Sequence, residues 1–444
     1  MRFFRPVAVA VTALAVAMSS AYSADLLTLY QDAATQDPAV ASAQAALLAA
    51  RERVTQAEAA NGFGAGINAG ANANYFDLHA RGFPNAATDR GYLTASVSAY
   101  VNKPLIRPAL IVAIEQARAS LTLFEVSLAA AQMDVATRLS QAYFDVLLAQ
   151  DNLTLVQAQK AAVGEQLAQA KRNFEVGTAT IVDTNEAQAR YDQVIAQEIA
   201  ANNEVERTRY ALRNVVGRYE TNLKRLRSNA QVPAPNPSNM DAWVSRAETE
   251  AFGVRIAQQT LTVAEYDIKR AQTGLAWTLD ATASVVHSQS TGGISTGIGT
   301  WVNSGVVGVT FNWPFDVSGG ANARIRETLA LVDKSRNDIE AARRLASLGV
   351  RQSYLGVTSG VASVVAQQQA LKSAETLLAS TKLGLEVGVR TNLDVLNAQQ
   401  QVTQVQRDLA LARYNTLLND LRLKAATGVL SEDDLRATNA YLTD

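Results

Sequence analysis

The sequence contains no cysteine, which excludes disulfides, thiolate metal sites and a lipid anchor on an N-terminal cysteine. Only two histidines occur and the formal net charge is −1, so the chain lacks the basic field that nucleic-acid binding requires. Proline is scarce, with 9 residues, and three of them fall together at Pro233, Pro235 and Pro237. Beyond the N-terminal region no run of about 18 apolar residues occurs, so no transmembrane helix is predicted there.

Motifs for catalysis are also missing from the sequence. It has no Gly-rich phosphate loop before a helix, no His–Glu zinc motif and no nucleophile elbow. His79 falls in a predicted outer loop and His287 near a predicted strand end, with Asp77 as the one carboxylate close to either. The sequence therefore predicts neither an enzyme nor a cofactor or metal site at these residues.

The first 23 residues have the features of a secretory signal peptide. Two arginines precede an uncharged stretch, residues 7–18, which is too short to anchor the chain by spanning a bilayer. Ala21 and Ser23 are small residues placed just before a plausible cleavage point at Ala24. We therefore expect the mature chain to be exported from the cytoplasm.

An internal repeat organises the rest of the chain. The same residues recur at a constant offset of 211 positions: Tyr143/Tyr354, Glu175/Glu386, Gly177/Gly388, Asp183/Asp394, Ala187/Ala398, Gln188/Gln399 and Gly217/Gly428. Chance does not readily explain a constant offset over about 75 residues. The proline-rich linker 232–239 then divides a first repeat, 24–231, from a second repeat, 240–430, with a C-terminal tail at 431–444.

Both repeats are rich in alanine, glutamine and leucine, and they carry apolar residues at alternating spacings of three and four. This pattern is typical of coiled coils. Gly177 and Gly388 interrupt it and are followed by turn-forming residues. The sequence therefore predicts helix hairpins over about 105–216 and 320–427, with these two glycines as helix C-caps.

The predicted helix lengths match in both halves. At about 1.5 Å per residue, an uninterrupted helix over about 105–176 spans roughly 105 Å. Shorter helices at about 25–60 and 178–216 add up to nearly that length, and the second half repeats the match with 320–387 against 240–273 and 389–427. Two short helices can therefore stack end to end beside each long one.

Between the helices lie four segments in which apolar and polar residues alternate strictly. They cover about 64–76, 92–103, 277–288 and 301–313, and each is long enough to cross a bilayer as a tilted strand. Loops at about 77–91 and 288–301 join them in pairs. Aromatic residues that fall near the strand ends are candidates for an interfacial girdle: Tyr75, Trp277, Trp301 and Trp313.

Four strands are too few for a membrane barrel, because known barrels start at about eight. A sheet that faces lipid also cannot leave an edge unpaired, since no water is present to satisfy it. Three copies sharing one barrel would supply 12 strands. Two soluble β-hairpins packed on helices remain an alternative.

Together these residues resemble the TolC family of outer-membrane efflux and secretion ducts. The most specific segments are 26–38 (LLTLYQDAATQDP), 174–192 (FEVGTATIVDTNEAQARYD) and 385–397 (LEVGVRTNLDVLN). The resemblance implies a mainly α fold with a transmembrane β-barrel portion. Four strands and long coiled-coil helices in each of three identical subunits would form a 12-stranded barrel in outer-membrane lipid, continued by an α-helical barrel through the periplasm.

The resemblance also implies a function and partners. The trimer would be a passive exit duct for small molecules or proteins, in a tripartite efflux pump or a type I secretion system. A periplasmic adaptor and an inner-membrane transporter of RND, ABC or MFS type would dock on its inner end. A periplasmic coiled-coil scaffold or adaptor without a pore is the alternative, although four alternating strands do not fit it.

In this family the hairpin end closes like an iris, and the resemblance carries over residue by residue. Asp183 and Arg390 would pair across coils, and Asp394 would supply one carboxylate per subunit to a ring that binds cations. Two positions depart from the family pattern. The family's second acidic position is Asn397 here, so we expect weaker block by multivalent cations. A pore-side tyrosine of the family is Leu385 here, which removes one hydroxyl link.

Overall fold

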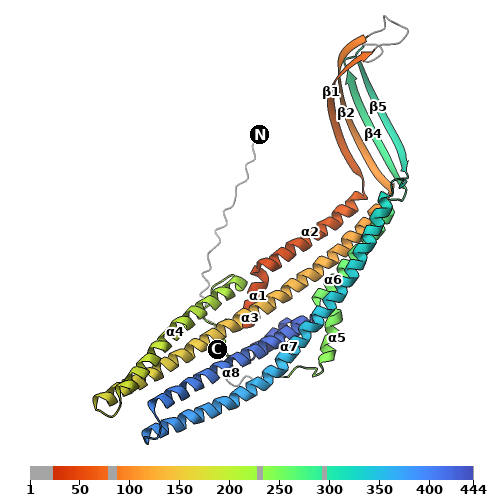
Figure 1. Cartoon of the computed structure of the whole chain (residues 1–444). Helices are drawn as coiled ribbons and strands as arrows, with labels where there is room; N and C mark the ends of the chain where they lie inside the picture. Colours follow the sequence, from red (N-terminus) through yellow and green to blue (C-terminus); the bar gives the residue numbers. More distant parts are fainter. Residues whose placement is uncertain (1–23, 79–87, 228–233, 293–297, 444) are drawn as a thin grey trace, which may run out of the picture.

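The computed structural model describes residues 24–78, 88–227, 234–292 and 298–443. The expected signal peptide, His79 and the central parts of both predicted outer loops lie outside the described residues. Figure 1 shows long helices forming a shaft, with a curved four-stranded sheet at one end of it.

The elements follow the order of the two repeats. The first contributes α1 (Leu26–Gln36), α2 (Pro38–Ala60), β1 (Gly64–Leu78), β2 (Thr88–Ile106), α3 (Pro108–Glu175), α4 (Ile181–Val216) and the short β3 (Arg225–Leu226). The second contributes α5 (Met240–Glu250), α6 (Phe252–Thr273), β4 (Thr278–Ser290), β5 (Thr300–Asn312), α7 (Gly320–Glu386), α8 (Asn392–Ala426), α9 (Glu432–Asn439) and β6 (Leu442–Thr443).

Two long helices carry the shaft, and shorter helices lie beside them in series. The 68 residues of α3 extend about 100 Å, with α2 packed along one part of it and α4 along the other. In the same way α6 and α8 lie along the 67-residue α7. None of the described helices combines the length and the apolar character that crossing a membrane requires.

The prediction of one helix over 25–60 was wrong, because the helix is interrupted at Asp37, between α1 and α2. The Asp37 carboxylate accepts hydrogen bonds from the backbone N–H of Ala39 and Val40 and so caps a new helix. Pro38 then occupies the first helical position, where its missing N–H does no harm. The predicted helix over 240–273 is likewise broken, at Ala251.

The sheet has the strand order β1-β2-β4-β5, and every pair is antiparallel. Register keeps the odd-numbered residues of all four strands on one face, for example in the row Ile67, Ala99, Val285 and Gly305. The first two strands run longer than predicted, and β2 in particular begins at Thr88 and ends at Ile106, whereas β4 and β5 lie within two residues of their predicted bounds. One face therefore presents alanine, valine, isoleucine and phenylalanine outward, as the alternation in the sequence predicts.

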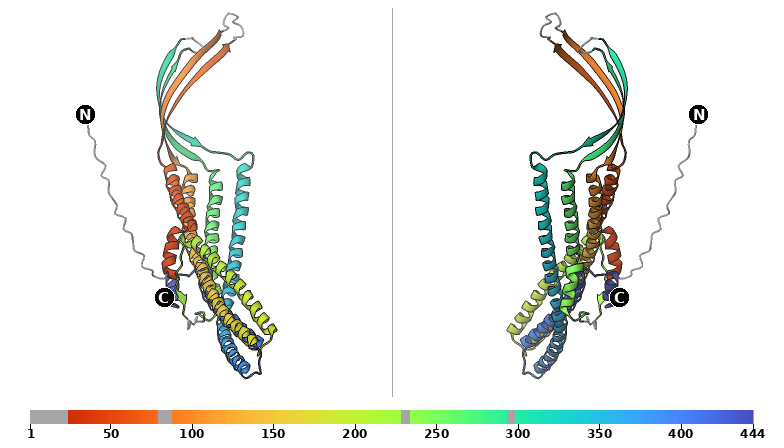
Figure 2. Two further views of the ribbon diagram at one scale, coloured as in Figure 1. Left: turned by 90° about the vertical axis from the view of Figure 1, so that its left-hand side faces the viewer. Right: turned by 90° about the vertical axis from the view of Figure 1, so that its right-hand side faces the viewer.

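The main core lies at mid-height of the shaft. Tyr143 and Phe144 of α3 are fully buried there against α1, α8 and α9, and the Tyr143 hydroxyl donates to the Lys224 carbonyl at 2.8 Å. The segment treated as a tail in the sequence folds into α9 and β6, and β6 pairs with β3. This arrangement ties the C-terminal end of the chain to the end of the first repeat (Figure 2).

A buried polar contact also joins the two repeats. The Tyr414 hydroxyl of α8 donates to Oδ2 of Asp151 on α3 at 2.6 Å. Burial raises the pKa of the Asp151 carboxyl, although this hydrogen bond and the charges of Arg225 and Arg413 oppose the shift. The contact holds α8 against α3 above the point where the two helix hairpins separate.

Candidate functional site

Two helix turns form the end of the shaft that lies farthest from the sheet. Gly177 and Gly388 adopt left-handed φ values of 80° and 79°, as glycine does most easily. Around Gly177, the Thr178 N–H donates to the Asn173 carbonyl and the Gly177 N–H to the Phe174 carbonyl, and Gly388 repeats both contacts. Both glycines therefore end their helices in Schellman motifs.

The next helix in each hairpin begins with a capping box. In the first hairpin the Thr180 hydroxyl accepts from the Asp183 N–H at 3.3 Å, and Asp183 Oδ2 accepts from the Thr180 N–H at 2.9 Å. Thr391 and Asp394 repeat this geometry at 3.2 and 2.9 Å. Both carboxylates thus have a structural role that the sequence analysis missed, although the spacing T-x-x-D signals it.

The caps keep both carboxyl groups ionised. Hydrogen bonds from the Thr180 hydroxyl and N–H lower the pKa of Asp183. For Asp394 the Thr391 N–H and hydroxyl have the same effect, and the positive charge of Arg390 adds to it. Each chain therefore carries these two carboxylates in the ionised form at its hairpin tips at neutral pH.

Loss of one cap should loosen one hairpin tip. We expect Thr391→Ala to destabilise the N-terminal turn of α8 by about 1 kcal/mol, because one orphan N–H and the reciprocal bond to Asp394 are lost. Hydrogen exchange of residues 389–396 measures this, and Thr391→Ser, which keeps the hydroxyl, is the control. Equal protection in Thr391→Ala and the wild type would contradict the role of the cap.

The two hairpins touch near their tips, where α8 packs against both α3 and α4. Leu396 of α8 is 4% exposed and packs in an apolar cluster with Val163 and Val194 of the first hairpin, beside Tyr191. Next to this cluster the Arg190 guanidinium of α4 donates to Asn397 Oδ1 at 3.3 Å and to Gln400 Oε1 at 3.2 Å.

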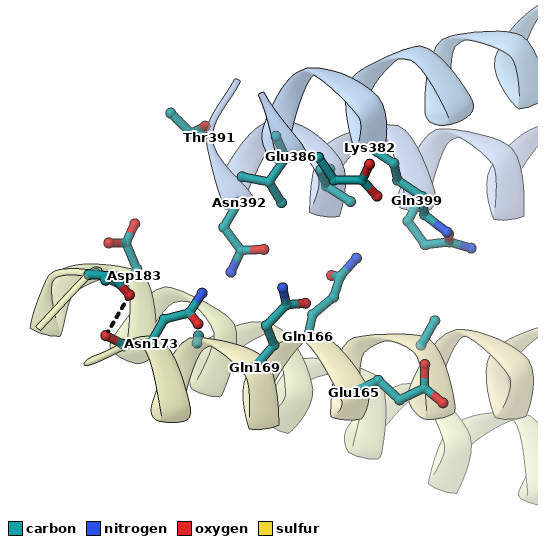
Figure 3. A pocket seen from close by; sticks show the side chains of 16 residues that line it. Glu165, Gln166, Gln169, Asn173, Asp183, Lys382, Glu386, Thr391, Asn392 and Gln399 are labelled. Carbon is teal, nitrogen blue, oxygen red and sulfur yellow. Dashed lines mark hydrogen bonds between the residues drawn. The ribbon is translucent and has the colours of Figure 1, made fainter. Parts of the chain in front are cut away.

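A cleft of about 580 Å³ separates the two hairpins nearer the turns. Figure 3 shows Gln166 and Gln169 of α3 facing Asn392 and Gln399 of α8 across it. Its rim carries Glu165, Asp183 and Glu386 with Lys382. The Oε1 atom of Gln166 is buried and has no hydrogen-bond partner among the described residues. The cleft is therefore polar, with an acceptor still free.

The structure brings together only some of the predicted gate residues. Asp183 and Leu385 both line the cleft, one from each hairpin. Arg390 forms no ion pair with Asp183 within the described chain; instead it packs against Gly384, where a Cβ would lie 2.7 Å from Cγ of Arg390. The predicted pairing of Asp183 with Arg390 across coils therefore stays a prediction.

The predicted girdle residues lie at the two ends of the sheet. Tyr75 and Trp301 are exposed at the loop end. At the helix end Trp277 stacks near Phe311 and Trp313 near Phe315, with ring centroids 5.7 and 5.3 Å apart.

His287 lies on β4, where its Nδ1 is 2.6 Å from Oδ1 of Asn303. Over the part of the chain that the structure describes, no group of three or more potential ligand side chains gathers to hold a metal.

Comparisons with known proteins agree on one family. A family profile described as outer membrane efflux protein matches residues 29–218 and 243–429. The outer membrane protein TolC of Vibrio cholerae is 30% identical over 432 residues, which is 97% of this chain and 96% of that protein. The alkaline protease secretion protein AprF of Pseudomonas aeruginosa is 31% identical over 309 residues, 69% of this chain and 64% of that protein.

A solved structure also shares the fold. The outer membrane protein VceC of Vibrio cholerae superimposes with a TM-score of 0.75 over 91% of this chain and 96% of that one. The two sequences are 18% identical, so this likeness concerns the fold alone.

Proposed function

Since this chain belongs to the outer membrane efflux protein family, we propose that three copies of it form one continuous tunnel from the outer membrane to the inner end of the helical shaft. The chain is an outer-membrane exit duct for efflux or type I secretion. Its assembly into a trimer, its partners and its gate are proposed.

The edges of the sheet carry the argument for a trimer. β1 and β5 are its outermost strands, and its odd-numbered face is apolar and exposed. In lipid such edges must be paired, and four strands cannot close on themselves. Pairing β5 of one copy with β1 of the next would close a ring, and the three copies that we propose would supply 12 strands.

The girdle residues support a membrane position for this ring. β5 has 13 residues from Thr300 to Asn312, with Trp301 near one end and Trp313 directly after the other. At about 3.3 Å per residue and a tilt of about 40°, such a strand rises roughly 33 Å, enough to cross the apolar band of about 25 Å in outer-membrane barrels.

The polar cleft between the hairpins is the proposed docking site for a periplasmic adaptor. Its walls come from two different helix hairpins, and its lining of glutamine and asparagine suits the polar face of a partner coil. The sequence has no nucleotide-binding motif, so the energy for export must come from an inner-membrane transporter of RND, ABC or MFS type.

We propose that the Asp394 carboxylates of three subunits form a ring at the narrow inner end. Such a ring concentrates cations and is blocked by them. Asp394→Asn keeps an oxygen that can cap α8 but removes the charge, so block of the current by divalent cations should weaken by about tenfold. Asp183→Asn makes the same change in the other hairpin and is the matched control. Equal loss of block in both variants would contradict a ring that is specific to Asp394.

Detergent-purified mature protein tests the duct itself. We expect a trimer by light scattering and discrete conductance steps in planar bilayers. A monomer that needs no detergent and is electrically silent would refute the proposal. Deletion of the gene, followed by comparison of drug susceptibility with the set of secreted proteins, then identifies the class of cargo.

A further inference from the structure

Polar side chains gather at one place on the face of the sheet that the proposed barrel turns toward lipid. His287 and Gln289 of β4 and Asn303 of β5 have odd numbers, so they share the apolar face, and all three are exposed on it. On β1 and β2 the odd-numbered residues over 65–73 and 93–101 are alanine, isoleucine, leucine and valine. The three polar residues therefore interrupt an otherwise apolar surface.

The depth of this cluster places it at the boundary between hydrocarbon and headgroups. Val307 lies at the middle of the apolar band, and the row of Asn303 is about 10 Å farther out, at about 3.3 Å per residue and a tilt of about 40°. The row of Gln289 and Trp301 is about 15 Å from the middle, whereas the band ends at about 12 Å. The cluster thus begins just inside the band and ends among the headgroups.

His287 and Asn303 satisfy part of each other's hydrogen-bonding capacity. Nδ1 of His287 lies 2.6 Å from Oδ1 of Asn303. An amide oxygen only accepts, so Nδ1 donates in this contact. The groups that can meet a ligand are then Nε2 of the ring and the amide nitrogen of Asn303. Polar atoms without a partner are costly in hydrocarbon, so a ligand with polar groups at this depth would stabilise the pair.

A shallow hollow of about 500 Å³ lies directly beside the cluster. His287 and Gln289 line the side of it that belongs to β4. Small apolar residues of β1 and β2 line another part: Ala69, Ala71, Ala95 and Val97. The hollow therefore offers an apolar surface to an acyl chain and a polar wall to the headgroup of the same molecule.

We propose that the cluster and the hollow bind a phosphorylated glycolipid of the outer leaflet, the lipid A part of lipopolysaccharide. This site depends on the duct proposed above, in which the loop end of the sheet, away from the shaft in Figure 1, reaches the outer leaflet. Lipid A carries hydroxyl and amide groups on its acyl chains just below the sugars, at the depth of His287 and Asn303. A glycerophospholipid has no hydrogen-bond donor at that depth, so it cannot donate to Nε2 of His287.

Native mass spectrometry of the detergent-purified trimer with added lipid A tests the site. His287→Leu with Asn303→Val should weaken the binding of lipid A by roughly tenfold, as expected for the loss of one or two hydrogen bonds. Ser288→Leu with Ser304→Val is the matched control, because these residues are the direct neighbours on the same two strands and point to the opposite face. Equal retention of lipid A in the wild type and both double variants would refute the site.

Thermal unfolding in nanodiscs separates binding from folding. In phosphatidylcholine discs His287→Leu with Asn303→Val should melt at or above the wild-type temperature, because the variant removes polar groups from the apolar band. Discs that contain lipid A should raise the Tm of the wild type and of the control variant but not of this variant. An equal rise in all three proteins would contradict the site.

Two further outcomes separate the ligand from the duct. If phosphatidylglycerol raised the Tm of the wild type as much as lipid A does, the site would read phosphate alone and the assignment to a glycolipid would be wrong. A conducting trimer without any preference for lipid A would refute the site and leave the duct intact, whereas a protein that forms no trimer would refute the duct.

Discussion

Val307→Arg is expected to remove the protein from the outer membrane, whereas Val306→Arg should leave it there. Val307 lies at the centre of β5 on the apolar face and is 87% exposed. An arginine at the midplane of the lipid face of a membrane barrel costs about 2–4 kcal/mol. The proposed trimer would contain three such residues, so the total cost would approach the whole stability of an ordinary domain. Val306 points to the opposite face, which carries Ser284 and Thr310 and would line a water-filled lumen.

The two variants are a matched pair, because they place the same charge on adjacent residues of the same strand. Cell fractionation should find Val307→Arg depleted from the outer membrane and degraded, and Val306→Arg present as a trimer. In planar bilayers Val306→Arg should shift the duct towards anion selectivity, since three positive charges would line the lumen. Loss of both proteins, or of neither, would contradict the assignment of the two faces.

The faces of the sheet could be predicted from sequence because the period of a strand is two. Because apolar and polar residues alternate in all four segments, each strand has one apolar and one polar face. In a membrane the apolar face is the one expected to contact lipid. The ends of the strands could not be predicted as well. β2 continues to Ile106 through Pro104, and only its pairing with β4, which shifts register between Pro104 and Ile106, extends the strand that far.

The role of Asp183 and Asp394 in the capping boxes was not predicted, although the local sequence indicates it. Thr180 and Asp183, like Thr391 and Asp394, have the spacing of a capping box and lie directly after a glycine turn. Local sequence was therefore sufficient to find the caps. The resemblance to the family implies a role in the pore for the same two aspartates. The two roles are compatible, because a capped carboxylate stays ionised.

Arg190 could not have been found from sequence alone. Its acceptors, Asn397 and Gln400, lie more than 200 residues away, on the other hairpin. Periodicity predicts which face of each helix is apolar, but it does not fix how two hairpins rotate about each other. The same holds for β3 and β6, two-residue strands whose pairing depends entirely on tertiary packing.

Substitution of Asp37, the residue between α1 and α2, is expected to cause a large loss of stability. Asp37 caps α2, and both of its carboxylate oxygens accept from the Arg138 guanidinium of α3, at 3.1 and 3.2 Å. Its side chain is 3% exposed, against 39% for Arg138. Asp37→Ala removes the cap and leaves Arg138 without its buried partner. We expect a loss of about 3 kcal/mol in the free energy of unfolding, below the upper range for broken buried pairs because Arg138 is partly solvated.

The pH dependence of this loss has a definite sign. Burial would raise the pKa of the Asp37 carboxyl, but hydrogen bonds from Arg138 and the Ala39 N–H outweigh it and hold the pKa below its usual range. Because the folded state has the lower pKa, the stabilisation is present above the unfolded value of about 3.9 and is lost as pH falls through the folded value. The gap between wild type and Asp37→Ala should therefore narrow below about pH 4.

Urea unfolding in detergent, followed by circular dichroism between pH 3 and 7, measures both effects. Asp134→Ala is the matched control, because Asp134 also accepts from Arg138, at 2.6 Å, yet is 61% exposed and caps no helix. It should cost less than about 0.5 kcal/mol. If Asp134→Ala were as damaging as Asp37→Ala, the charge of Arg138 rather than the capped break would be what fixes α2 against α3. Asp37, together with Pro38 after it, explains why two short helices rather than one continuous helix lie beside α3.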